Sequence, residues 1–148
     1  MSITKISQAF IIDNSKILMQ LRDFNSDINF PGHWGFFAGH IKQNELPENT
    51  IKRELNEELS WLPKKISYIK KFTLFNSLNV YVYKCRLDVP FRELNLQEGQ
   101  DMNFFSFQEI LDNQLYSNKF NLNFPISPLS LSIFLKIKDK LYLNEKYQ

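Results

Sequence analysis

Three glutamates near the middle of the chain are the residues best suited to do chemistry. In a helix, Glu54, Glu57 and Glu58 stand at i, i+3 and i+4, so their carboxylates share one face. Like charges at this spacing repel one another, and the cluster becomes favourable only when a cation binds it. Mg²⁺ and other hard divalent cations prefer oxygen ligands of this kind. The spacing therefore predicts a metal-binding helix face.

An amphipathic helix must hold these carboxylates in place. Pro47 suits a first helical position, and the helix must stop before Pro63, which predicts a helix from residue 47 to about residue 59. Leu46 is a poor N-cap for it. Apolar residues recur on a neighbouring face at i, i+4 and i+8, namely Ile51, Leu55 and Leu59. That stripe anchors the helix to a core while the acidic face stays available.

The wider segment from Gly39 to Trp61 resembles the signature of the Nudix (MutT-type) hydrolases. The signature is a Gly, five residues, a Glu, seven residues, and then Arg-Glu-apolar-x-Glu-Glu-x-Gly-apolar. Here it is Gly39, then Glu45, then Arg53-Glu54-Leu55-Asn56-Glu57-Glu58-Leu59-Ser60-Trp61. Ser60 replaces the usual glycine after the helix, where a left-handed conformation is common, and Asn44 replaces a glycine before Glu45. Neither change removes a charged position.

The resemblance implies hydrolysis of a nucleoside diphosphate linked to another moiety, with Mg²⁺ or Mn²⁺ as cofactor. It implies metal ligation by the Gly39 carbonyl, Glu57 and Glu58, and it makes Glu54 a ligand or the base that accepts a proton from water. Arg53 and Glu45 are expected to orient the glutamates. Glu98 matches a loop where many members place another metal-binding or basic glutamate.

Several residues have both a possible role in substrate binding and a purely structural interpretation, and the sequence leaves the two alternatives open. Arg22 ends a predicted strand and can contact a phosphate or form a surface ion pair. His40 can touch a phosphate or have no role. Trp34 and Phe37 can stack on a base or belong to the core, and the same holds for Phe36 and Tyr81.

The rest of the chain predicts a mixed sheet with helices packed on it, in the α/β or α+β class. The resemblance implies an α/β/α sandwich with a mixed central sheet. Expected strands cover residues 4–12, 16–22, 34–38, 66–75, 78–87 and 102–106. Short and C-terminal helices are expected at 107–113, capped by Ser106 and Glu109, and at 127–143. The C-terminal helix should turn these residues toward the core: Leu131, Phe134, Leu135, Ile137 and Leu141.

Composition narrows the class of protein. The 148 residues suit one domain spanning 1–148, and 43% apolar residues are enough for a core. The net charge is +2 and no block of Lys or Arg stands out, which argues against strong nucleic-acid binding. Cys85 is the single cysteine and should pack as a small hydrophobe. No signal peptide or membrane span is evident, so a cytoplasmic location is expected. Homodimers are common in the family, so a homodimer is possible.

The leading hypothesis is a divalent-metal-dependent pyrophosphohydrolase acting on a small-molecule nucleotide. One alternative is a catalytically silent nucleotide-sensing domain on the same fold, although such proteins usually lose motif glutamates that this chain keeps. Another is an RNA 5′-end pyrophosphohydrolase, which the small net charge disfavours. Motifs of NADH-cleaving and coenzyme A-cleaving members are absent. Asn76-Ser77-Leu78 also lacks the proline or tyrosine cues of members that prefer ADP-ribose or dinucleoside polyphosphates, which leaves nucleoside triphosphates and nucleotide sugars open.

Overall fold

The chain forms two compact units, each made of two separate stretches of sequence. A computed structural model describes residues 2–146. The first unit holds the chain up to Ile12 together with Phe37–Gln97, and the second holds Asp13–Phe36 together with the chain from Glu98 onward. No helix in the described part of the chain is long and apolar enough to cross a membrane.

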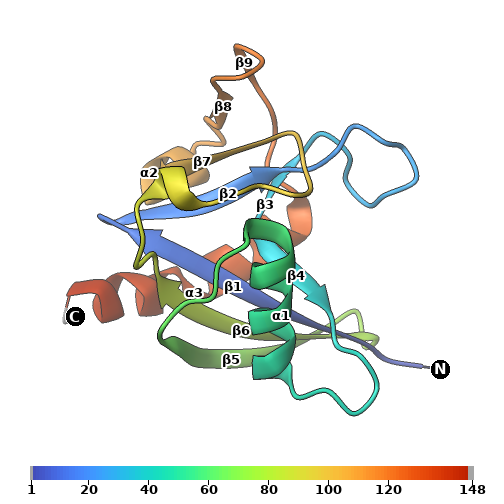
Figure 1. Ribbon diagram of the computed structural model, residues 1–148. Helices are drawn as coiled ribbons and strands as arrows, with labels where there is room; N and C mark the ends of the chain where they lie inside the picture. The colour runs from blue at the N-terminus through green and yellow to red at the C-terminus, as the bar shows by residue number, and fades with distance from the viewer. Residues whose placement is uncertain (1, 147–148) are drawn as a thin grey trace. The chain divides into compact units, whose positions relative to one another are not determined.

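A mixed sheet forms the first unit. Its strands are β1 (Thr4–Asp13), β4 (Phe37–His40), β5 (Ile66–Leu74) and β6 (Leu78–Arg86). β1 pairs antiparallel with β4 and parallel with β6, and β6 pairs antiparallel with β5. Figure 1 shows β1, β6 and β5 as neighbouring arrows. The presence of parallel and antiparallel pairs beside helices confirms the α+β class with a mixed sheet.

Helix α1 (Pro47–Leu59) covers one face of this sheet. The Ser7 hydroxyl of β1 donates to the Pro47 carbonyl at 2.8 Å, which fixes the start of the helix above the strand. The predicted stripe of Ile51, Leu55 and Leu59 is fully buried. Each such side chain contributes roughly 1.5–3 kcal/mol by leaving water. The same face of the sheet carries Ala9, which is also fully buried.

The connection between β5 and β6 is a tight turn, in which Phe75 and Asn76 both have positive φ. After β6 the chain forms a 3₁₀ turn, η1 (Phe91–Glu93). Cys85 of β6 is buried, as the sequence predicts, and burial raises the pKa of its thiol to about 12.

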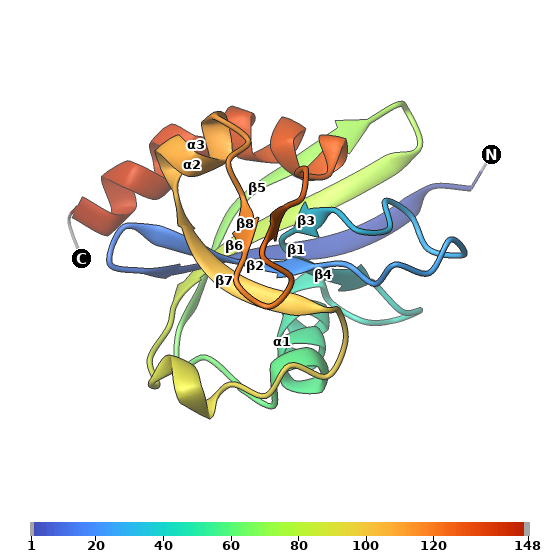
Figure 2. The same ribbon diagram turned by 90° about the horizontal axis from the view of Figure 1, so that it is seen from above.

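The second unit has its own strands and two helices. Its elements are β2 (Lys16–Leu21), β3 (Trp34–Gly35), β7 (Asp101–Ser106), α2 (Phe107–Leu111), β8 (Tyr116–Ser117), β9 (Leu122–Asn123) and α3 (Pro128–Lys146). β2 pairs antiparallel with β3 and β7, and β8 pairs with β9. Figure 2 shows α2 beside α3, where Phe107 and Phe134 have ring centroids 5.3 Å apart. The predicted capping box of Ser106 and Glu109 is present in α2.

Three expectations about elements need correction. The expected strand 34–38 is two strands, because Trp34–Gly35 pairs with β2 whereas Phe37–His40 pairs with β1. Leu135 is 48% exposed rather than in the core, and Ile133 takes the buried position on α3. The short pair β8 and β9 was not expected. The expectation of one domain over residues 1–148 stays a prediction.

Candidate active site

Glu45 secures the loop before α1. Its Oε1 accepts a hydrogen bond from the Thr50 hydroxyl at 2.8 Å and another from the Lys42 backbone N–H at 3.1 Å. Leu46 stands at the N-cap without a side-chain bond, as the sequence predicts for a leucine there. Glu45 and Thr50 thus tie the loop to the first turn in place of a conventional cap.

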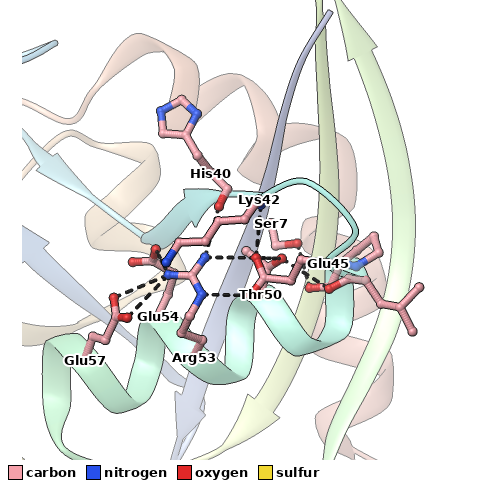
Figure 3. A network of polar contacts seen from close by, with 10 residues as sticks. Ser7, His40, Lys42, Glu45, Thr50, Arg53, Glu54 and Glu57 are labelled. Atoms are coloured by element: carbon pink, nitrogen blue, oxygen red, sulfur yellow. Dashed lines mark hydrogen bonds and ion pairs between the residues drawn. The ribbon is translucent and has the colours of Figure 1, made fainter.

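Arg53 lies at the centre of the acidic cluster (Figure 3). Its Nε donates to Glu45 Oε2 at 2.8 Å, and its Nη2 donates to Glu45 Oε1 at 3.0 Å, a bidentate pair. Nη1 donates to Glu54 Oε1 at 2.9 Å and reaches Glu57 Oε2 at 3.4 Å. Nη2 also donates to the His40 carbonyl at 3.1 Å. One guanidinium therefore holds three carboxylates and the end of β4 together.

The network shifts the pKa of its members. Hydrogen bonds from Arg53 and from the Lys42 N–H are the main reasons that the pKa of Glu45 is lowered to about 2. The hydrogen bond to Glu45 is the largest cause that raises the pKa of Arg53 further above its ordinary value. Both shifts keep the two groups charged, so the ion pair is permanent at neutral pH.

Gly39 permits the helix to approach β4 closely. A Cβ placed on Gly39 would overlap with Cδ and Oε1 of the Glu54 carboxylate. Any side chain at position 39 would therefore displace the Glu54 carboxylate. The glycine in the motif serves to seat this carboxylate against the backbone of β4.

Glu58 differs from the other motif glutamates in its environment. It is only 6% exposed, whereas the Glu57 side chain is 53% exposed. The carbonyl of Glu58 accepts from the Gln97 N–H at 2.8 Å, and the Leu59 carbonyl accepts from Asn95 at 3.0 Å. The chain just before Glu98 therefore runs along the C-terminal end of α1. Glu98 itself is exposed and belongs to the second unit.

The carboxylate oxygens of the acidic cluster are suitable ligands for a metal ion. In this structure they surround the guanidinium of Arg53. Within the described part of the chain, no three carboxylate, imidazole or thiol side chains converge so as to hold a metal ion. Arg53 Nη1 instead donates to Glu54 and Glu57. Carboxylate oxygens suit Mg²⁺ or Mn²⁺, and the exposed Glu57 can turn toward a cation. The donor set fits such an ion, and its ligands stay predictions.

The two polar residues expected to contact substrate have local roles here. Arg22 Nε donates to the Asn29 carbonyl at 2.7 Å and so folds the loop after β2, in the second unit. His40 is exposed and pairs in register with Ile6, on the opposite face of the sheet from Gly39 and Glu54. Figure 3 shows its ring directed away from the carboxylates.

The two aromatic residues expected to stack on a base are core residues. Trp34 and Phe37 are both fully buried. The Trp34 indole N–H donates to the Leu115 carbonyl at 2.9 Å, and its ring lies edge-on to Phe105 at 4.8 Å. Neither ring leaves a face for a base, so the structure supports the core interpretation and corrects the stacking one. Phe36 is buried as well, whereas Tyr81 is partly exposed.

Two residues of the site have no counterpart in the sequence-based expectations. Thr50 is buried and bonded to Glu45, and Ser7 is buried and bonded to Pro47. A contact between Thr50 and the loop before α1 could have been suspected, because Thr50 is a polar residue in the first turn of the helix, one position before the apolar stripe. Ser7 depends on pairing between distant strands, which no local pattern reveals.

Comparison with solved structures supports the fold. The NUDIX domain of NrtR from Shewanella oneidensis, complexed with ADP ribose, matches with a TM-score of 0.70 at 18% identity, covering 95% of this chain and 90% of that one. The Escherichia coli ORF135 protein matches with a TM-score of 0.63 at 20% identity over 93% and 92%. A MutT NUDIX hydrolase from Burkholderia pseudomallei matches with a TM-score of 0.63 at 18% identity over 88% and 94%.

The family follows from the sequence match. No curated protein matches this chain. The model of the NUDIX domain matches residues 5–124, which include the strands and helix around Arg53 and parts of both units. The chain therefore belongs to the NUDIX domain family.

Proposed function

We propose that this protein hydrolyses a diphosphate linkage in a nucleoside diphosphate derivative, with Mg²⁺ or Mn²⁺ as cofactor. One observation carries the proposal: three motif carboxylates already surround a positive charge. Arg53 bonds Glu45, Glu54 and Glu57 at once, and Gly39 leaves room for Glu54 against β4. An acidic face preorganised in this way suits a divalent cation, which in turn can neutralise the charge of a diphosphate.

The metal would be held by the Gly39 carbonyl, Glu54, Glu57 and Glu58, with Glu98 as a further ligand or base. A bound divalent cation neutralises diphosphate charge and lowers the pKa of water. The nearby residues keep the carboxylates in position. Arg53 and Glu45 act as positioning residues, because their bidentate pair links the loop before α1 to the glutamate face.

In the reaction, a water oxygen forms a bond to one phosphorus while the anhydride P–O bond breaks and its electron pair leaves with the other phosphate. A carboxylate accepts the proton of the attacking water, and Glu54 or Glu98 would take this role. Glu54 has a defined seat against Gly39, whereas Glu98 lies in an exposed loop.

The substrate side of the site is proposed more broadly. Arg22 and His40 remain candidates for phosphate contacts, although each has the local arrangement described above. The NrtR domain is complexed with ADP ribose, so ADP-ribose is a reasonable first nucleotide derivative to test here.

A release assay tests the proposal. The protein is incubated with nucleoside triphosphates, nucleotide sugars, ADP-ribose and dinucleotides, with Mg²⁺, with Mn²⁺ or with EDTA, and products are separated by chromatography. We expect a nucleoside monophosphate as one product from at least one substrate, only when metal is present. Binding without turnover across all substrates would instead support a silent nucleotide-sensing domain.

A further inference from the structure

A cavity of about 340 Å³ opens beside the loop that precedes α1, within the first unit. Its lining combines two lysines and a tyrosine with the motif loop, and it includes Lys5, Lys42, Glu45 and Tyr81. This volume is at the lower end of small-molecule sites and suits a ligand the size of one nucleotide. The Glu45 carboxylate in its wall is engaged by Arg53 and Thr50, which lessens its repulsion of an anion.

An aromatic and basic surface continues from the cavity along β6 and β5. Tyr81 pairs in register with Lys71, whose Nζ lies 5.7 Å from the centre of the Tyr81 ring. The next aromatic pair on this face is Tyr68 and Tyr83, with ring centroids 5.4 Å apart. Lys5 and Lys71 are exposed, so both ammonium groups are available to a ligand.

The charges of the first unit are segregated along the sequence. The segment 61–87, which contains both strands of this hairpin, has no Asp or Glu and carries the basic residues Lys64, Lys65, Lys70, Lys71, Lys84 and Arg86. The preceding segment holds the motif glutamates. A net charge of +2 therefore conceals a basic hairpin next to an acidic helix. Within this hairpin Lys71 lies beside Tyr81, whereas Lys70 is on the other face and Lys84 is buried.

We propose that this cavity and the adjoining Tyr81–Lys71 surface form a nucleotide-binding site separate from the carboxylates of Glu54, Glu57 and Glu58. The base stacks on Tyr81, and Lys5 and Lys71 hold the phosphate. The ligand chemistry is a phosphate next to a planar base, which a free nucleotide or a nucleotide within a single-stranded RNA can supply. The site goes beyond the proposed hydrolysis, because it needs neither the metal nor the carboxylates of Glu54, Glu57 and Glu58.

Binding in EDTA tests the site without any hydrolysis. AMP is titrated by calorimetry, and a fluorescent single-stranded octa-adenylate is titrated by anisotropy, both at low salt. We expect at least one probe to bind. If AMP binds as tightly as the octa-adenylate, the site is one for free nucleotides. If the octa-adenylate binds more tightly, the site is one for single-stranded RNA. Failure of both probes to bind would overturn the proposal.

Matched variants locate the binding. Lys71→Gln should weaken the binding of the probe about fivefold. It should also lower the slope of log affinity against log salt concentration by about one. Lys70→Gln makes the same charge change on the other face of β5, opposite Val82, and should change affinity less than about twofold. Equal losses in both variants would show general attraction to a basic surface and contradict the site.

Tyr81 supplies a second test. Tyr81→Leu should weaken binding about fivefold or more, whereas Tyr81→Phe keeps the ring and should bind like the wild type. Unchanged affinity in Tyr81→Leu, with an unchanged melting temperature, would exclude stacking there. The Glu57→Gln/Glu58→Gln double variant should bind as the wild type does, which separates this site from the outcome of the hydrolysis assay.

Discussion

At the scale of single residues, Arg53 explains how an acidic helix face is stable without a metal ion. Its side chain is 22% exposed and spans Glu45, Glu54 and Glu57, so one charge offsets several like charges. Exposed ion pairs contribute little, but a bidentate pair within a network fixes geometry. Arg53 therefore matters more for the placement of the carboxylates than for their charge.

A substitution of Arg53 by lysine separates these two roles. Lysine keeps the charge but cannot reproduce the bidentate pair with Glu45, so we expect turnover to fall about 10- to 100-fold while the fold persists. Turnover and circular dichroism measure the two effects. Lys52→Gln, which removes the exposed pair with Glu48, is the control and should keep near wild-type turnover. Full turnover in Arg53→Lys would refute the positioning role.

The lowered pKa of Glu45 predicts part of the dependence of protein stability on pH. Its pKa is lowered from 4.5 to about 2 in the folded protein, so the charged form stabilises the fold above pH 4.5. This contribution is lost as the pH falls from 4.5 toward about 2. Thermal melts across this window should show a smaller pH dependence for Glu45→Gln than for the wild type. Parallel curves would show that Glu45 makes no such contribution.

At the scale of elements, α1 was predictable because its signals are local. Pro47 at the first position, the apolar stripe and the stop before Pro63 all lie within a few residues, and the helix runs over Pro47–Leu59 as expected. The left-handed conformations of Asn44 and Ser60 also follow from sequence, because both stand where the signature has glycine. The glutamate face could be predicted for the same reason.

Ser60 gives a stability prediction at this scale. It ends α1 with φ 53° and ψ 41°, a conformation that glycine adopts without steric cost. Ser60→Gly should raise the free energy of unfolding by about 1 kcal/mol in denaturant melts. Ser132→Gly, inside α3, should lower it by about 0.5 kcal/mol. A destabilised Ser60→Gly would indicate that the serine side chain has a role of its own.

Other elements depended on contacts that a single sequence does not reveal. Residues 34–38 form an apolar run, but their division between β3 and β4 follows from pairing with two different strands. Leu135 fits a helical stripe, yet α3 turns Ile133 inward instead, because its packing partners decide which face is buried. β8 and β9 have two residues each, too short for a periodic pattern.

At the scale of the whole molecule, the reaction class is better specified than the substrate. The motif glutamates, Arg53 and Gly39 lie on one strand, one loop and one helix of the first unit, so their mutual placement follows from local structure. Arg22 and Glu98 lie in loops of the second unit, where length and local bonds such as Arg22 to Asn29 decide the conformation. The motif does not extend into these loops, so substrate choice cannot be predicted from the motif.

The most direct test of the central claim is metal-dependent turnover by the Glu57→Gln/Glu58→Gln double variant. With the best substrate from the release assay and saturating Mg²⁺ or Mn²⁺, we expect turnover to fall by at least about 1,000-fold, because two metal ligands lose their charge while their size is kept. The variant should retain a cooperative thermal transition and the wild-type circular dichroism spectrum. Wild-type turnover in this folded variant would contradict the assignment of the glutamate face as the hydrolytic site.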